Sequence, residues 1–92
     1  MSIFSVSYDQ HDPDVGYVGV YKVLEKCNAS VRILESTWFV KTSKSAEELG
    51  EQLREAGGDK LGILINPGQF PVCSYLNKKT WNDLKKLFGM PV

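Results

Sequence analysis

Segments with two different hydrophobic periods alternate along this chain, and their order constrains the fold more than any other sequence feature. Residues 3–8, IFSVSY, alternate as a β-strand does. Apolar residues recur at helical spacing over residues 17–27 and again over residues 46–56. Residues 30–42 and 60–66 are rich in β-forming side chains. The order predicts an α+β domain, a ferredoxin-like βαββαβ two-layer sandwich with its two main helices on one sheet face.

Local signals set the ends of these segments. Residues 30–42, SVRILESTWFVKT, are long for one strand, so we expect two strands or one strand bent near Glu35 to Thr37. Ser45 and Glu48 fit a capping box at the start of the second helix, and Gly57 with Gly58 fits its end. Near the first helix, Asp12 followed by Pro13 predicts an N-cap, with Asp14 in the first turn.

The chain divides into a core of about residues 2–66 and a C-terminal extension, residues 67–92. The extension begins with a loop, in which residues 72–75 are a candidate short edge strand. It ends with a helix over residues 78–88, capped by Asn77. The inward side of this helix would carry Trp81, Leu84 and Phe88.

Composition limits the function classes. The chain has 92 residues and a formal net charge of zero, so it has no strong overall field to draw it onto nucleic acid or anionic lipid. No apolar run is long enough to span a membrane, and the N-terminus lacks the pattern of a signal peptide, so we expect a cytoplasmic protein with no membrane partner. Cys27 and Cys73 are then expected to stay as thiols.

The segment TWFV places large apolar groups on both faces of its strand: Trp38 and Val40 point one way and Phe39 the other. Both faces of the sheet should therefore be covered at this point. A chain this small often gains stability by self-association. We therefore expect a homodimer, formed through the open face of the sheet.

Three stretches are similar to a known family: FSVSYD at residues 4–9, LESTWFVKT at 34–42, and SAEELGEQL at 45–53 ahead of DKLGILI. They resemble the small second core subunit of CRISPR adaptation complexes and its relatives, the virulence-associated protein D toxins. The closest likeness is to a stand-alone SinR-like branch, over about residues 3–66. The resemblance implies a ferredoxin-like fold, a homodimer and, where activity is present, metal-dependent phosphodiester cleavage in RNA or DNA.

The resemblance also implies site residues. Asp9 matches the family's acidic residue, of which two copies face each other across the dimer axis, where the pair could hold Mg²⁺ or Mn²⁺. Ser36 matches a serine near that pair. The adaptation subunits have an arginine-rich first helix, whereas this chain offers only Lys22 and Lys26, with Arg32 just beyond. This difference argues against tight binding of duplex DNA.

Taken by themselves, the same residues allow two interpretations each. Asp9 is a turn residue or half of a metal site. His11 is a solvated side chain or a general acid or base. Ser36 is part of a bend or a phosphate contact. Along the last helix, a solvated face or a phosphate-binding patch would be formed by Lys78, Lys79, Lys85 and Lys86.

Two classes of function follow. The first is a small homodimeric protein that associates weakly with nucleic acid or with a protein partner and has weak or no catalytic activity. The alternative is a metal-dependent endoribonuclease of the toxin type, which cuts RNA at the carboxylate pair with Asp9, His11 and Ser36 as its catalytic residues. The single acidic residue of each half-site and the missing arginine cluster favour the first.

Overall fold

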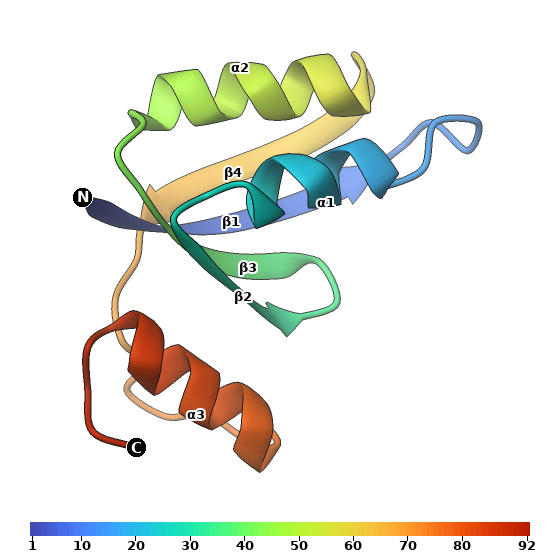
Figure 1. Cartoon of the computed structure of the whole chain (residues 1–92). Helices are drawn as coiled ribbons and strands as arrows, with labels where there is room; N and C mark the ends of the chain where they lie inside the picture. The colour runs from blue at the N-terminus through green and yellow to red at the C-terminus, as the bar shows by residue number, and fades with distance from the viewer.

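The structure, a computed structural model, describes residues 1–92 and contains four strands and three helices (Figure 1). In chain order these are β1 (Ser2–Gln10), α1 (Val18–Glu25), β2 (Ala29–Leu34), β3 (Thr37–Thr42), α2 (Ala46–Gly57), β4 (Leu61–Pro67) and α3 (Lys78–Leu87). The predicted α+β class and the predicted order of elements are confirmed. Residues 72–75 do not form the candidate edge strand.

The four strands form one sheet in the order β2-β3-β1-β4, with antiparallel neighbours throughout. The N-terminal strand β1 is therefore internal, and its Val6 lies between Trp38 of β3 and Ile65 of β4. The run over residues 30–42 is two strands joined by a turn at Glu35 and Ser36, as one of the two predicted alternatives requires. This turn and the end of β1 lie close together, because Tyr8 N–H donates to Ser36 O at 3.1 Å.

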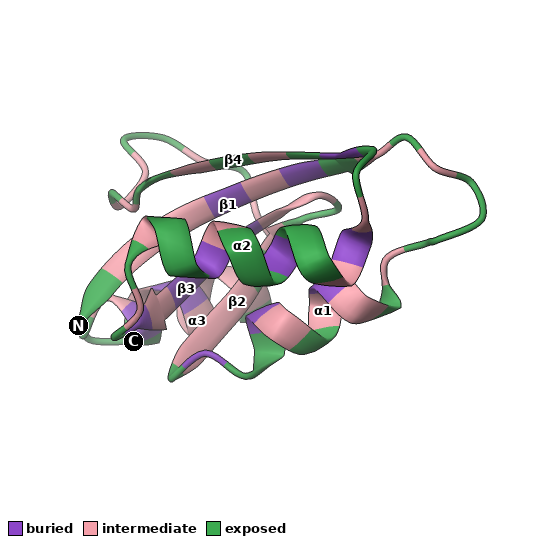
Figure 2. Cartoon of the chain, turned by 90° about the horizontal axis from the view of Figure 1, so that it is seen from above, coloured by how far each residue is buried: buried purple, intermediate pink, exposed green.

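Both α1 and α2 pack on one face of the sheet, as expected (Figures 1 and 2). The alternation of β1 explains this arrangement, since Val6 and Tyr8 point toward the helices and are buried. The strongest local signal is at α2, where the predicted capping box between Ser45 and Glu48 is present. The buried residues of this layer are Val6, Tyr8, Val20, Leu24, Cys27, Trp38, Val40, Leu49, Leu53 and Leu61.

The third helix covers part of the opposite face (Figure 1). Phe39 of β3 is buried there against Leu84 and Leu87 of α3, which starts at the predicted cap Asn77. The expectation that both faces are covered at Phe39 is confirmed, but the cover comes from the same chain. This removes one of the reasons given above for a homodimer.

The predicted start of the first helix is wrong. Residues 13–15 form a turn, and α1 begins at Val18 after Tyr17, with no side-chain cap and no acidic residue in its first turn. Between the turn and the helix, Gly16 has a φ of 72°, a conformation outside the right-handed helical region. Asp12 therefore organises a turn, where its Oδ1 accepts from Asp14 N–H at 3.0 Å.

Two helical glycines should respond to the same substitution in opposite directions. A Cβ at Gly19 would lie 2.9 Å from the backbone oxygen of Ala56, so Gly19→Ala should push α1 away from α2. Overpacking costs about 1–3 kcal/mol, more than the gain of about 1 kcal/mol in helix propensity. A Cβ at Gly50 would meet only the Ile65 side chain at 3.6 Å, so Gly50→Ala should stabilise the protein by roughly 0.5–1 kcal/mol.

Urea denaturation of both variants beside the wild type measures these differences. A lower midpoint for Gly19→Ala and a higher one for Gly50→Ala are expected. If both midpoints rose, the close approach of α1 to α2 at Gly19 would contribute nothing to stability.

Candidate functional site

Asp9 is an exposed carboxylate near the C-terminal end of β1. It follows the buried Tyr8 in the strand, so its side chain points to the opposite sheet face, away from α1 and α2. There, 73% of the Asp9 side-chain surface is exposed. Its paired residue in β4 is Gly62. No backbone N–H donates to the Asp9 carboxylate. The geometry therefore gives no support to the interpretation of Asp9 as a turn residue. The aspartate that organises a turn here is Asp12.

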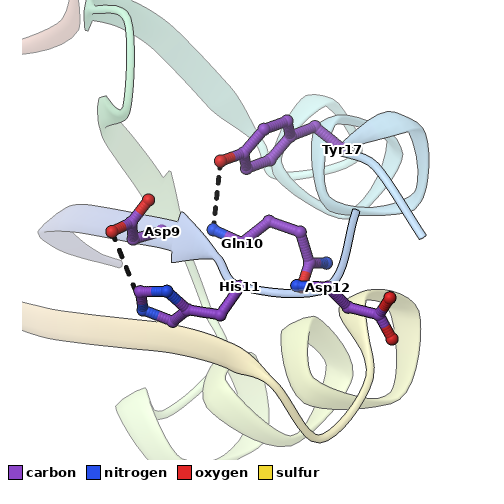
Figure 3. A network of polar contacts seen from close by, with 5 residues as sticks. All are labelled: Asp9, Gln10, His11, Asp12 and Tyr17. Atoms are coloured by element: carbon purple, nitrogen blue, oxygen red, sulfur yellow. Dashed lines mark hydrogen bonds and ion pairs between the residues drawn. The ribbon is translucent and has the colours of Figure 1, made fainter. Parts of the chain in front are cut away.

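His11 is the one side chain within ion-pair distance of this carboxylate. Its Nε2 lies 3.7 Å from Asp9 Oδ2, and the ring is 64% exposed (Figure 3). The backbone N–H of His11 donates to Lys60 O at 3.2 Å, and this hydrogen bond fixes the backbone position of His11. A Cβ at Gly62 would lie 3.8 Å from Nε2, an ordinary van der Waals distance, so the ring lies beside Gly62 of β4. The two side chains attract each other when the histidine is protonated.

Within one chain this pair does not amount to a metal centre, since no group of three or more His, Cys, Asp and Glu side chains comes together. One carboxylate and one imidazole could supply two ligands to a hard divalent cation, which takes about six. The remaining positions would need water, substrate oxygens or a second copy of the chain. The interpretation of Asp9 as half of a metal site stays a prediction.

The loop after Asp9 is organised by a residue that the sequence analysis passed over. Gln10 Nε2 donates to Gly57 O at 2.8 Å and to Gly16 O at 3.2 Å, and Gln10 Oε1 accepts from Asp12 N–H at 3.1 Å. The Gln10 backbone N–H donates to the Tyr17 hydroxyl at 3.0 Å (Figure 3). Gln10 therefore ties the loop to the end of α2. The sequence feature that could have pointed to Gln10 is its position in β1, because it lies on the same helix-facing side as Tyr8.

Ser36 lies close in space to the end of β1, because its carbonyl accepts from the N–H of Tyr8, the residue before Asp9. Its hydroxyl makes no hydrogen bond to His11, so the structure contains no nucleophile and base pair at this position. The following Thr37 instead pairs its hydroxyl with that of Ser7 at 3.0 Å. Beside it, Ser7 and Asp9 line a shallow hollow of about 380 Å³ over β4.

Behind the site, aromatic side chains form a buried network. Trp38 Nε1 donates to the Tyr8 hydroxyl at 2.9 Å, and that hydroxyl donates to Glu35 O at 3.3 Å. Burial is the main cause that raises the pKa of Tyr8 above its usual value. Tyr8 and Trp38 are 5% and 7% exposed, so neither ring is free to stack on a nucleic-acid base.

Arg32 is tied into the same end of the sheet. Its Nε and one terminal nitrogen donate to Glu35 O at 3.1 and 2.7 Å, and that nitrogen also donates to the Tyr21 hydroxyl. The guanidinium carbon lies 4.8 Å from the centre of the Tyr21 ring. These contacts close the turn between β2 and β3, so much of the donor capacity of Arg32 is already used.

The remaining basic candidates fall into two groups on opposite faces of the sheet (Figure 1). Lys22 is exposed on α1 and Lys26 is exposed at its C-cap, whereas α3 carries the four lysines of the extension, Lys78, Lys79, Lys85 and Lys86. Lys79 donates to Asp83 at 2.8 Å, and this hydrogen bond lowers the pKa of the Asp83 carboxyl. Lys85 lies 5.5 Å from the centre of the Trp81 ring. The structure does not bring the two groups into one patch.

Of the three helices, none has the length and apolar character needed to cross a membrane. Comparison of the chain with protein-family models, with curated proteins and with solved structures finds no match.

Proposed function

We propose that this chain is a small homodimeric protein of the ferredoxin-like class that associates weakly with nucleic acid. The sheet order β2-β3-β1-β4, with α1 and α2 on one face, supports the fold assignment. The observation that carries the functional proposal is the Asp9 carboxylate, which is 73% exposed at a strand end with His11 as its only partner. Two such carboxylates across a twofold axis would bind Mg²⁺ or Mn²⁺ between them.

Electrostatics support weak rather than tight binding. The formal net charge is zero, and the lysines of α1 and α3 lie on opposite faces, so one strand of nucleic acid would meet few of them at once. Each neutralised phosphate adds to affinity and to its salt dependence. We therefore expect micromolar or weaker affinity at physiological salt, with a shallow dependence on salt concentration.

The second candidate function, metal-dependent cleavage of RNA, rests on the neighbourhood of Asp9 and His11. A metal held by the carboxylates would lower the pKa of a bound water, and a neutral imidazole nearby would accept or deliver a proton. In this mechanism Ser36 could contact a phosphate but would not act as a nucleophile, since no base lies in contact with it.

Thermal melting with and without Mn²⁺ tests the metal site. Two facing carboxylates repel, so a cation between them should stabilise the native dimer of the wild type. The midpoint should rise by about 4–8 °C for each kcal/mol of binding free energy. Asp9→Asn should abolish this rise. Asp12→Asn is the matched control: it removes the same charge three residues away and keeps the oxygen that accepts from Asp14 N–H.

Fluorescence anisotropy tests the association with nucleic acid, using a labelled single-stranded RNA and a labelled duplex DNA. Each is measured at roughly 50 and 200 mM salt, because contacts to phosphates weaken over this range. Loss of Mn²⁺-dependent RNA cleavage in Asp9→Asn, but not in Asp12→Asn, would establish the second candidate. Equal metal shifts in all three proteins, together with no binding at the lower salt, would contradict the proposed function.

A further inference from the structure

The neutral total of this chain hides a separation of charge. The extension, residues 67–92, has a formal net charge of +3, because it carries one acidic residue, Asp83, and four lysines, Lys78, Lys79, Lys85 and Lys86. The whole chain has 11 basic and 11 acidic residues, so residues 1–66 hold seven and ten of them and have a net charge of −3. A local field acts on a charged surface even where the total is zero. The expectation of no membrane partner rested partly on the whole-chain charge, which does not describe the extension.

The loop between β4 and α3 presents apolar side chains to water. Val72 is 105% exposed and Tyr75 is 97% exposed, and no residue from 61 to 77 carries a charge. We name residues 71–75 the tip. Phe70 and Leu76, which flank it, pack against the apolar cluster under α3, so the loop is anchored on both sides and the tip projects from the domain. Apolar side chains exposed together on a compact domain indicate a contact surface.

The tip and one side of α3 form a continuous surface. The tip lines a hollow of about 580 Å³ together with Lys78 and Trp81 of α3. Trp81 follows Lys78 by three residues, so the two side chains lie on the same side of the helix. Lys85 continues this side, with its Nζ 5.5 Å from the centre of the Trp81 ring. The surface is therefore apolar at the tip and basic immediately behind it.

The shape and the chemistry of this surface favour a lipid bilayer as its partner. The hollow is shallow, because Val72 and Tyr75 line it and are almost fully exposed, so it does not enclose the side chain of a peptide. The phosphates of a nucleic acid would pair with the lysines but leave Val72 in water. An anionic bilayer satisfies both parts of the surface. Its interfacial region takes up apolar and aromatic side chains, and its headgroups attract lysines.

We propose that the extension binds the surface of an anionic membrane: Val72 and Tyr75 enter the interfacial region of the bilayer, and Lys78 and Lys85 lie at the lipid phosphates. The same surface repels the acidic remainder of the chain, so the domain is held with its tip toward the lipid. No helix crosses the bilayer in this arrangement. The contact needs no metal, no nucleic acid and no second copy of the chain, so the inference goes beyond the proposed function.

Co-sedimentation with vesicles, without metal or nucleic acid, tests the basic part of the contact. The protein should bind vesicles of phosphatidylcholine mixed with phosphatidylglycerol, but not vesicles of phosphatidylcholine alone, and added salt should weaken the binding. Lys78→Gln with Lys85→Gln should weaken it by about 25-fold, which is roughly fivefold for each lysine. Lys22→Gln with Lys26→Gln is the matched control. It removes the same charge on the other side of the sheet (Figure 1) and should bind like the wild type.

The tip variant Val72→Ser with Tyr75→Ser tests the apolar part at constant charge. Both residues are exposed, so the variant should melt like the wild type but bind the mixed vesicles on the order of tenfold more weakly. An environment-sensitive dye on the exposed Cys73 should report an apolar setting when these vesicles are added, whereas the buried Cys27 stays unlabelled. No binding to the mixed vesicles, undiminished binding of the tip variant, or equal losses in the two lysine variants would overturn the inference.

Nucleic-acid binding, which tests the proposed function, is read separately. A protein that binds the mixed vesicles but no RNA or DNA would contradict the proposed function and support this inference, and the reverse result would do the opposite.

Discussion

Leu84→Ala should lower the free energy of unfolding by about 2–5 kcal/mol, the range for emptying a fully buried leucine position. Leu84 is 0% exposed and joins α3 to the sheet beside Phe39 and Leu87. A domain of this length has a total stability of roughly 5–14 kcal/mol, so the variant should lose a large share of it. Urea denaturation followed by circular dichroism gives the value.

Val18→Ala, which shortens a side chain that is 66% exposed on α1, is the control and should change stability by less than about 0.5 kcal/mol. The fluorescence of the half-buried Trp81 adds a local reading, because it should shift toward that of a solvated indole if α3 detaches first. A stability for Leu84→Ala equal to that of the control would mean that α3 does not dock on the sheet.

Tyr8→Phe should destabilise the protein by about 1–3 kcal/mol, although it removes only one oxygen. That oxygen accepts from Trp38 Nε1 at 2.9 Å inside the aromatic network, and the substitution leaves a buried indole N–H without an acceptor. Tyr75→Phe makes the same change at a tyrosine that is 97% exposed and should have almost no effect. The double variant Tyr8→Phe with Trp38→Phe removes donor and acceptor together. A cost no smaller than the sum of the single costs would contradict the account.

The same tyrosine should affect stability at alkaline pH. Burial raises the pKa of Tyr8 above 10.0 in the native state, so the unfolded chain releases this proton at a lower pH than the folded one. The stabilisation is present in full below about pH 10 and is lost as the pH rises toward the folded pKa. Tyr8→Phe should therefore lose less stability than the wild type between neutral and alkaline pH, and a parallel loss in both proteins would argue against this origin.

What could be predicted from the sequence depended on how local its cause was. The start of α2 is set by Ser45 and Glu48, three residues apart, and the prediction was correct. Asp12 and Pro13 are an equally local signal, but they suit a turn as well as a helix start. In the structure the side chain of Gln10 ties this turn to Gly57 of α2, and no local pattern reveals a contact between residues 47 positions apart.

The cover over Phe39 illustrates a second limit. Apolar groups on both faces of β3 required a layer on each side, and this was read correctly from the sequence. A helix of the same chain and the sheet of a second copy would bury Phe39 equally well, so the pattern could not decide between them. The structure assigns the role to α3 and leaves the homodimer as a proposal.

For the candidate site, the resemblance singled out Asp9, whereas the residues by themselves left it as a turn residue or half of a metal site. The contact with His11 was open, since residues two apart along an extended strand point to the same side but those in a loop need not. The separation of the lysines could not be foreseen, because whether α1 and α3 share a face is a property of the tertiary fold alone.

The internal position of β1 has a consequence for the protein as it is made. Ser7 pairs with Thr37 and Leu64, so the β3 side of β1 stays unpaired until Thr37 has been made and the β4 side until Leu64 has been made. At about 5–20 residues per second, an apolar strand stays unpaired on the nascent chain for seconds. Only the β2–β3 hairpin can close early. The yield of protein in cells should therefore depend on how well β1 is shielded on the nascent chain, more than on the stability of the finished domain.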